Sequence, residues 1–236
     1  MIKSFITDSG IVVPAVTTDQ MREVDRIAME ESGPNLFQMM ENAGRNLALT
    51  AMEMMGTKWK QASYVILAGS GGNGGGGICA ARHLANRGLA VHLAFTDYRR
   101  LGEVPQFQRH IYQSAGGKEV SLSDLQSEST DLLIDAIIGY SLRAAPGGPA
   151  LEFIRWANAS QRPVLSLDVP SGVDSTTGKA AGDYIRANRT MTLALPKTGL
   201  VSNCTGQLVL ADIGIPQGVY QKLGLDYIHP FGNLFR

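Results

Sequence analysis

Apolar residues recur at helical spacing near the N-terminus, which predicts two consecutive helices. Thr17 and Gln20 have the spacing of a capping box, and Gly33-Pro34 ends the helix that they begin. Asn35 can cap the second helix. The apolar faces are Met21, Val24, Ile27 and Ala28 in the first helix, and Leu36, Met39, Met40, Ala43, Leu47 and Ala51 in the second. The methionines in these faces are interpreted as core filling.

From Tyr64 onward, short apolar runs alternate with helical patterns. The run Tyr64–Ala68 is unbroken, which is typical of a strand covered on both faces. Further strands are predicted at 90–95, 132–138, 164–169, 191–195 and 207–212, and helices at 78–87, 105–114 and 149–160. Such alternation predicts right-handed crossovers and a parallel sheet with helices on both sides.

Composition narrows the classes of function. The chain has 236 residues, 44% of them hydrophobic, and no linker or repeat divides it, so we expect one domain over residues 1–236. Lys plus Arg equals Asp plus Glu at 21 each, so no global charge attracts nucleic acid or a membrane. No apolar run approaches the length of a membrane span, and we expect a cytoplasmic protein. Cys79 and Cys204 form neither a disulfide framework nor a metal-binding spacing, and Cys79 is expected to be a buried, inert thiol.

Candidate chemistry lies at the carboxyl ends of the predicted strands, where open parallel sheets bind ligands. The segment GSGGNGGGG (69–77) follows the first strand and satisfies G-x-G-x-x-G, with Asp97 after the next strand. This is a match to a dinucleotide-binding fingerprint, in which a phosphate rests on a helix N-terminus. Packing of a helix on a strand needs one glycine rather than four, so the remaining glycines favour a ligand. The alternative is a flexible loop without a ligand.

Two aspartates stand among apolar residues at other strand ends. Asp135 lies in LLIDAIIGYS and Asp168 in VLSLDVPSGVDS, with the hydroxyl of Ser171 nearby. A buried carboxylate must be paired or must bind a cation. Carboxylate, amide and hydroxyl oxygens suit a hard cation such as potassium or magnesium. Alternatively, Asp135 accepts hydrogen bonds from a neighbouring loop. The four histidines are scattered along the chain and are not expected to be catalytic.

The motifs occur in an order that resembles a known family. They are TTDQMREVDRIAMEE with LFQMMENAGRNLA, GSGGNGGGGICAARHLANRG, DAIIGYSL, SLDVPSGVDSTTG and ALPKTG. From about Thr17 to Ile213, the chain resembles the YjeF N-terminal domain family, whose enzymatic members are NAD(P)H-hydrate epimerases. The resemblance implies a three-layer αβα sandwich of Rossmann-like type that is frequently dimeric. It also implies an isomerase that interconverts the R and S forms of NADHX and NADPHX in coenzyme repair.

The resemblance also implies the site residues. Potassium would be bound by Asn73, Asp135 and Ser171. The substrate would contact the glycine segment (Gly72, Asn73, Gly74, Gly75 and Gly76), the segment Gly139, Tyr140, Ser141, Leu142, Arg143, Ala144 and Ala145, and Asp168. Family members usually carry asparagine at the position of Gly72 and aspartate at that of Gly76. The pathway partner would be a separate ADP- or ATP-dependent dehydratase, because this chain has no kinase-like second domain.

Hydration leaves a hydroxyl on the ring carbon beside the nitrogen, so the ring can lose and regain water through an iminium-like state. Asp168, partly buried, is the expected acid and base, and Asp168→Asn is expected to remove activity with little change in stability. Lys197 would neutralise a phosphate or assist proton transfer, unless it is an ordinary surface lysine. Two other functions compete with the epimerase: a non-catalytic nucleotide-binding or dimerisation scaffold, for which messenger-RNA decapping scaffolds give the precedent, and an NAD-dependent dehydrogenase.

Overall fold

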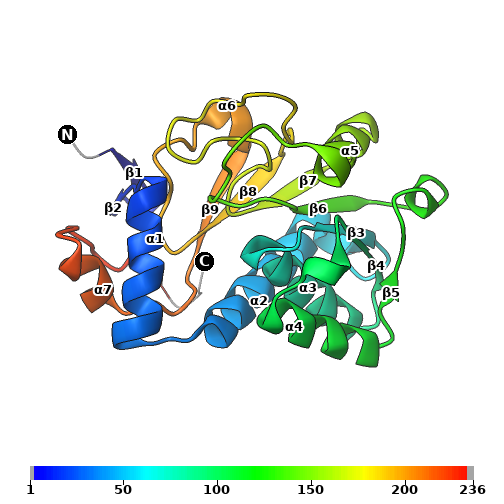
Figure 1. The fold of residues 1–236 in the computed structure, drawn as a ribbon, viewed down its shortest axis with the longest axis horizontal. Helices are drawn as coiled ribbons and strands as arrows, with labels where there is room; N and C mark the ends of the chain where they lie inside the picture. The colour runs from blue at the N-terminus through cyan, green and yellow to red at the C-terminus, as the bar shows by residue number, and fades with distance from the viewer. Residues whose placement is uncertain (1–2, 233–236) are drawn as a thin grey trace.

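A seven-stranded sheet forms the centre of the molecule (Figure 1). The computed structural model describes residues 3–232. The strands stand in the order β5-β4-β3-β6-β7-β8-β9, and every neighbouring pair is parallel. Their bounds are β3 (Ser63–Ala68), β4 (Ala90–Phe95), β5 (Lys118–Glu119), β6 (Leu132–Ala136), β7 (Val164–Leu167), β8 (Arg189–Leu193) and β9 (Gln207–Ala211). The predicted α/β fold with a parallel sheet is confirmed.

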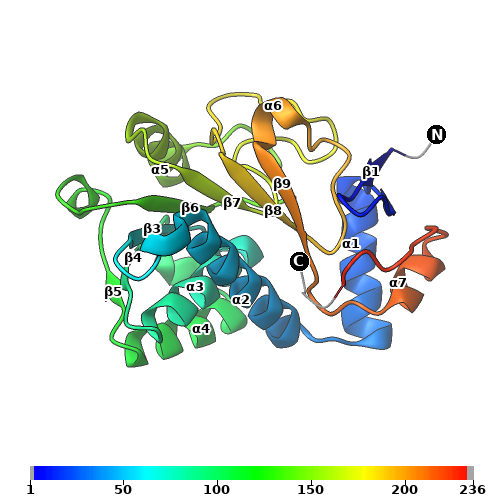
Figure 2. The same ribbon diagram turned by 180° about the vertical axis from the view of Figure 1, so that it is seen from behind.

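Helices cover both faces of the sheet. Figures 1 and 2 show α2, α3 and α4 on one face and α5 on the other. Their bounds are α2 (Leu36–Met55), α3 (Gly72–Ala85), α4 (Glu103–Ser114) and α5 (Gly148–Ala159). The α5 face is completed by the coil between β7 and β8 and by the short α6 (Ser202–Thr205). Helix α1 (Thr18–Ile27) packs with α7 (Gln217–Lys222) at the β9 side of the molecule.

The connections between strands reverse direction at the neighbouring strands β3 and β6. From β3 the chain moves outward through β4 to β5, then returns to β6 and continues the other way. Crossovers therefore leave in opposite directions from these two neighbours, which opens a crevice at their carboxyl ends. The register pairs Ala68 with Ala136, so both strands end at the same level. Segments that follow β3 and β6 must meet there.

The capping predicted for the two N-terminal helices is present. The Thr17 N–H donates to Oε1 of Gln20 at 2.9 Å, and the Gln20 N–H donates to the Thr17 hydroxyl at 3.3 Å. Asn35 and Gln38 form the same reciprocal pair at the start of α2. Met21, Val24 and Ile27 are buried as predicted. After Ile27 the first helix continues as a wider π-type turn over Ala28–Ser32.

The helix predicted at 78–87 begins six residues earlier, at Gly72, so most of the glycine segment is helical rather than loop. Close packing against neighbouring residues explains why these helical positions are glycines. A Cβ on Gly77 would lie 2.5 Å from the Cβ of Ala136, and one on Gly75 would lie 2.4 Å from Cε of Met40. Contacts this short do not occur between real side chains, so the expectation that one glycine suffices for packing was wrong.

Further elements differ from the prediction. The antiparallel hairpin of β1 (Ser4–Ile6) and β2 (Val12–Pro14) and the two-residue strand β5 were not expected. The strand predicted at 164–169 ends at Leu167, because Asp168 has a left-handed backbone with φ of 68°. The strand expected at 191–195 spans Arg189–Leu193.

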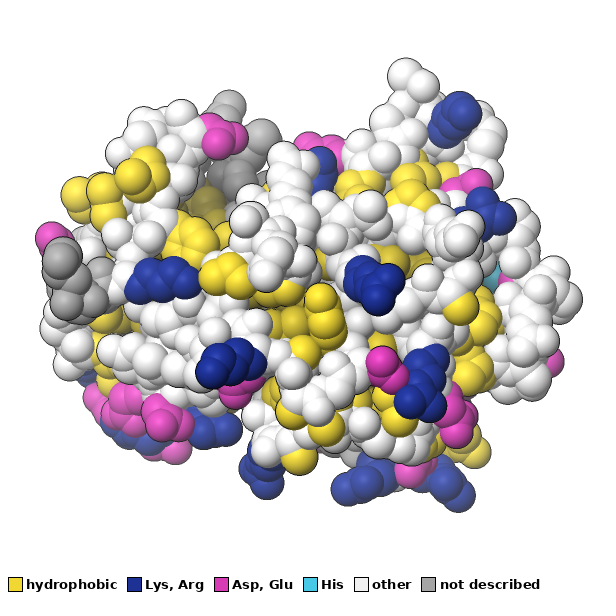
Figure 3. All heavy atoms as spheres, turned by 90° about the horizontal axis from the view of Figure 1, so that it is seen from above, with side chains coloured by type: hydrophobic (Ala, Val, Ile, Leu, Met, Phe, Trp, Pro, Cys, Tyr) yellow, Lys and Arg dark blue, Asp and Glu magenta, His cyan; other side chains and the backbone are white. Residues whose placement is uncertain are grey.

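The outer surface carries charges of both signs. Basic, acidic and apolar side chains are interspersed over the face seen in Figure 3. Within residues 3–232, no helix combines the length and the apolar character that crossing a membrane requires.

Candidate active site

A pocket of about 220 Å³ lies at the carboxyl ends of the central strands. One wall is apolar and consists of methionines that project from the first two helices and the turn between them. These residues are Met21, Met29, Met39 and Met40. The polar side chains of the lining include Asp25, Tyr140, Asp168 and Lys197. Met39 and Met40 are buried, so they fill the core as predicted and also line the pocket.

Asp168 and Lys197 form a buried ion pair in the lining of the pocket. Asp168 is 3% exposed and Lys197 1% exposed, and the lysine Nζ contacts Oδ1 of the aspartate. Nζ also donates to the carbonyl of Leu193 at 2.8 Å. The interpretation of Lys197 as a surface lysine was wrong, because the chain after β8 turns inward and buries it.

Backbone donors complete the surroundings of Asp168. The N–H of Tyr140 donates to Oδ2 at 3.1 Å, and the N–H of Leu193 donates to Oδ1 at 3.3 Å. Asp168 is therefore a member of a buried ion pair rather than the isolated, partly buried acid that the sequence suggested.

Asp25 is a pocket residue that the sequence analysis missed. It comes from α1, and its Oδ2 accepts a hydrogen bond of 2.6 Å from the hydroxyl of Tyr140. Burial raises the pKa of Asp25, and its hydrogen bond from Tyr140 and the charge of Lys197 oppose this only partly. Burial and the negative charge of Asp25 also raise the pKa of Tyr140. A signal was present in the sequence, because Asp25 follows Met21 by one helical turn on a face that is otherwise apolar.

Asn73, Asp135 and Ser171 meet around the segment that follows β6. The carboxylate of Asp135 is fully buried and accepts from the Ser171 hydroxyl at 2.5 Å and the Ser171 N–H at 2.9 Å. The hydroxyl of Ser166 and the N–H of Ile137 donate to the same carboxylate. Burial raises the pKa of Asp135, although these hydrogen bonds act in the opposite direction.

The side chain of Asn73 lies on the other side of the same segment. A Cβ on Gly139 would lie 2.9 Å from its Oδ1, so the glycine allows this close approach. The Nδ2 atom is buried and has no hydrogen-bond partner among residues 3–232. The Ser171 hydroxyl lies 3.1 Å from the carbonyl of Ile138. The side chain of Asn73, the Ser171 hydroxyl and the Ile138 carbonyl thus offer oxygen atoms along the same short segment, and the Asp135 carboxylate contacts Ser171.

The other predicted substrate contacts divide into three groups. Gly72, Gly76, Gly139 and Ser141 line the pocket with Asn73 and Tyr140. Gly74 and Gly75 face packed atoms instead. Leu142, Arg143, Ala144 and Ala145 lie outside the pocket lining, in a mostly exposed loop.

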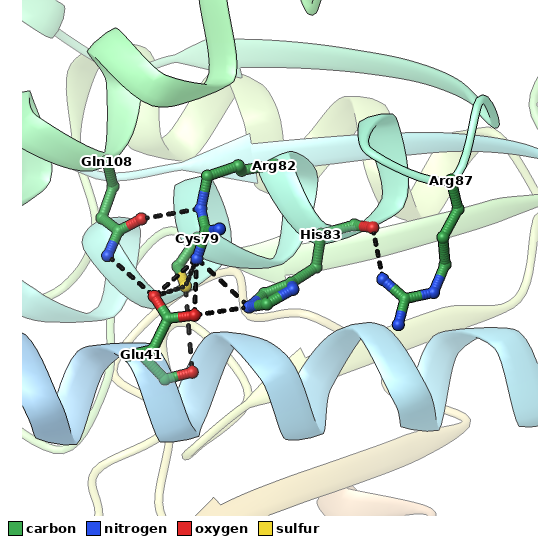
Figure 4. Close-up of polar contacts among 6 residues, drawn as sticks. All are labelled: Glu41, Cys79, Arg82, His83, Arg87 and Gln108. Carbon is green, nitrogen blue, oxygen red and sulfur yellow. Dashed lines mark hydrogen bonds and ion pairs between the residues drawn. The ribbon is translucent and has the colours of Figure 1, made fainter. Parts of the chain in front are cut away.

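A separate polar cluster, whose residues are not part of the pocket lining, connects α2 with α3 and α4 (Figure 4). Glu41 accepts from Arg82 at 2.7 Å and lies 2.9 Å from Nε2 of His83, and Gln108 bonds both Glu41 and Arg82. Cys79 is buried as predicted, and burial raises the pKa of its thiol to about 12. Potential metal-ligand atoms of Glu41, Cys79 and His83 lie within 4.8 Å of one another. The guanidinium of Arg82 contacts all three, so it already supplies the positive charge of this cluster.

Comparison with known proteins identifies the family to which this chain is similar. Residues 36–199 match the family described as YjeF-related protein N-terminus. A protein of Dehalogenimonas lykanthroporepellens named NAD(P)H-hydrate epimerase is 48% identical over 98% of this chain and 95% of its own length. A bifunctional NAD(P)H-hydrate repair enzyme Nnr of Moorella thermoacetica is 35% identical, and this chain spans only 41% of it.

Two other similar proteins share a smaller fraction of identical residues with this chain. An enhancer of mRNA-decapping protein 3 from Macaca fascicularis is 31% identical over 99% of this chain, which spans 46% of that protein. The crystal structure of the yeast protein ynu0 superposes with a TM-score of 0.80 at 25% identity, over 93% of this chain and 96% of the yeast chain. The resemblance that the motifs indicated is confirmed, and the chain belongs to the YjeF-related protein N-terminus family.

Proposed function

We propose that this chain is an NAD(P)H-hydrate epimerase, an isomerase that interconverts the R and S forms of NADHX and NADPHX. The observation that carries the proposal is the buried Asp168–Lys197 pair, which faces a pocket at the switch point of a parallel sheet. The 48% identity to a protein named for this activity supports it over nearly the whole chain.

The pocket and the N-terminus of α3 would bind different parts of the dinucleotide. A cavity of about 220 Å³ is smaller than the roughly 300–1,000 Å³ of sites that enclose a whole drug-sized ligand, so it fits one ring of the coenzyme. The N-terminus of α3 offers free N–H groups and a positive dipole end for the pyrophosphate. Gly71 and Gly72 at this terminus face open space, so a phosphate can approach the backbone.

The polar side chains of the pocket supply the proton transfer. The hydroxyl of the hydrated ring departs as water once it is protonated, and water returns to the iminium-like ring carbon when a base accepts its proton. Asp168 can accept that proton, and the Lys197 ammonium can hold the Asp168 carboxylate in place until the proton arrives. Buried side chains also limit the access of competing water.

Potassium is the cofactor that we propose for the adjacent oxygen-rich place. The fit rests on the donor set, since the amide oxygen of Asn73, the Ser171 hydroxyl and the Ile138 carbonyl are oxygen ligands of the kind that a hard cation prefers. Asn73, Ser171 and the Ile138 carbonyl would hold the ion. The Asp135 carboxylate already accepts four hydrogen bonds and would contribute mainly its charge. The bound cation would fix the loop that carries Gly139 and Tyr140.

The bifunctional relatives link this domain to a dehydratase of the same repair process. We propose that a separate ADP- or ATP-dependent dehydratase consumes the S form that this chain produces, and that both act in the cytoplasm. A homodimer is a further part of the proposal. Ile6 and Val12, which are 71% and 52% exposed on an isolated two-stranded hairpin, offer apolar surface for it. Light scattering of the purified chain measures this directly.

The decisive experiment is a one-pot assay. A mixture of NADHX epimers is incubated with an S-specific dehydratase, with and without this chain. We expect complete conversion only when the chain is present. Equal amounts of untouched R epimer in both reactions would refute the epimerase and favour the scaffold role suggested by the decapping relatives. A dehydrogenase would instead reduce or oxidise intact coenzyme.

A further inference from the structure

Two carboxylates, not one, face the candidate pocket, and a single tyrosine connects them. The backbone N–H of Tyr140 donates to Asp168, and its side-chain hydroxyl donates to Asp25. Asp25 and Asp168 therefore sit at opposite ends of Tyr140, separated by the length of its side chain. They also come from different elements, since Asp25 belongs to α1 and Asp168 follows β7.

The two carboxyl groups have different hydrogen-bond and ion-pair partners. Asp168 is paired with the buried ammonium of Lys197 and accepts hydrogen bonds from two backbone N–H groups. Within residues 3–232 the Asp25 carboxyl group has one hydrogen bond, from the Tyr140 hydroxyl, and burial raises its pKa, so it is suited to carry a proton. Two carboxyl groups in one site with such different surroundings, one beside a buried ammonium and one beside a hydroxyl, are the usual arrangement of an acid and a base.

An epimerase has a use for such an arrangement. The hydroxyl leaves from one face of the ring and must return to the other, so a single acid–base group would have to reach both faces. We infer that Asp25, held by Tyr140, is the second acid–base group of this pocket, and that it serves one face of the hydrated ring while Asp168 with Lys197 serves the other. This inference rests on the proposed epimerase function.

The step balances without any other reactant. The Asp25 carboxyl gives its proton to the ring hydroxyl, the carbon–oxygen bond breaks with its electron pair leaving on water, and the nitrogen lone pair forms the iminium bond. Water then adds to the opposite face, the iminium pair returns to nitrogen, and the proton of that water passes to the Asp168 carboxylate. One proton has moved from Asp25 to Asp168, and exchange with solvent or reverse turnover resets the pair.

The test uses water labelled with oxygen-18 and separates inversion from simple exchange. Each epimer of NADHX is incubated with the protein, and mass spectrometry after chromatography reports inversion and label in the ring hydroxyl. We expect Asp25→Asn to lose inversion by about a hundredfold or more. It should still exchange label into one epimer, through the remaining Asp168. Tyr140→Phe should weaken the same half of the reaction, and Asp168→Asn should retain exchange only into the other epimer.

Controls separate the possible outcomes. Asp19→Asn changes an exposed aspartate on the same helix and should behave as wild type in both assays. Inversion by Asp25→Asn within about twofold of wild type would overturn the inference and leave the epimerase intact. Equal loss of exchange into both epimers would also overturn it, because Asp25 would then only support the pocket. Absence of inversion by the wild-type chain would overturn the proposed function together with this inference.

Discussion

At the scale of single residues, the site is built on conformations and charges that are costly in themselves. Asp168 and Ala194, which end two neighbouring strands, both have left-handed backbones with φ of 68° and 61°. Such strain costs about 1–3 kcal/mol per residue and persists only where the surroundings impose it. Here it aims the Asp168 carboxylate at Lys197. The attraction between the charges of Asp168 and Lys197 then offsets the free-energy cost of burying them.

This pairing changes the expectation for Asp168→Asn. The sequence suggested little effect on stability, but the substitution would leave the Lys197 ammonium buried without a counter-charge. Removal of one partner of a buried pair typically costs about 3–5 kcal/mol. We therefore expect Asp168→Asn and Lys197→Met each to lower the unfolding free energy by about that amount in urea titrations. The double variant should lose less than the sum of the two, and strict additivity would contradict an energetic pair.

Asp25 gives a prediction about pH. Its folded-state pKa is raised above the ordinary value of 3.8, so its burial destabilises the fold increasingly as pH rises through that raised pKa. Asp25→Asn removes the charge and should leave the variant more stable than wild type at neutral pH. The difference in melting temperature between the two proteins should shrink toward zero near pH 4. A variant that melts lower at pH 7 would show that the ionised carboxylate stabilises the fold.

At the scale of elements, the glycines at and near the start of α3 have two different roles. Gly74, Gly75 and Gly77 let the helix lie close to backbone or side chains of its neighbours, while Gly71 and Gly72 face open space. Gly76 is intermediate, since its Cβ would lie 2.8 Å from the movable Cδ2 of Leu167 and would border the pocket. The inner glycines therefore bring the helix to the sheet, and the outer ones leave its N-terminus open to a ligand.

A matched pair of alanine substitutions tests this division. Gly77→Ala would press a methyl group against Ala136 and should destabilise the protein by about 1–3 kcal/mol. Gly72→Ala has free space at the first helical position and should be neutral or stabilising by up to about 1 kcal/mol. Thermal unfolding of both variants measures the difference. Equal destabilisation by the two would mean that backbone freedom, not packing, selects glycine here.

At the scale of the whole molecule, the sheet order decides which segments share the site. The segments after β3, β6, β7 and β8 contribute, and α1 closes the pocket from the N-terminal part of the chain. The proposed potassium ion would lie among three of these segments, through Asn73, Ile138 and Ser171. Its binding should therefore stabilise the fold as a whole rather than one loop.

Potassium should accordingly raise the melting temperature relative to choline chloride at the same ionic strength. At a concentration of about 100 times Kd the gain is about 2.7 kcal/mol, and each kcal/mol corresponds to roughly 2–4 °C for a chain of this size. Asn73→Ala should abolish the difference, while Asn203→Ala, on the exposed side of α6, should keep it. A wild-type protein that melts at the same temperature in both salts would exclude a potassium site of useful affinity.

Local patterns in the sequence predict the alternation of strands and helices, the two capped N-terminal helices and the candidate residues Asn73, Asp135, Asp168 and Lys197. These patterns are apolar periodicity, capping spacing, and polar residues at the ends of apolar runs. The folded arrangement was needed to show that Lys197 is buried against Asp168, that Asp25 and Tyr140 face the same pocket, and that most of the glycine segment belongs to a helix. Those facts depend on distances between segments far apart in the chain, which side-chain packing and strand order fix and which local patterns do not contain.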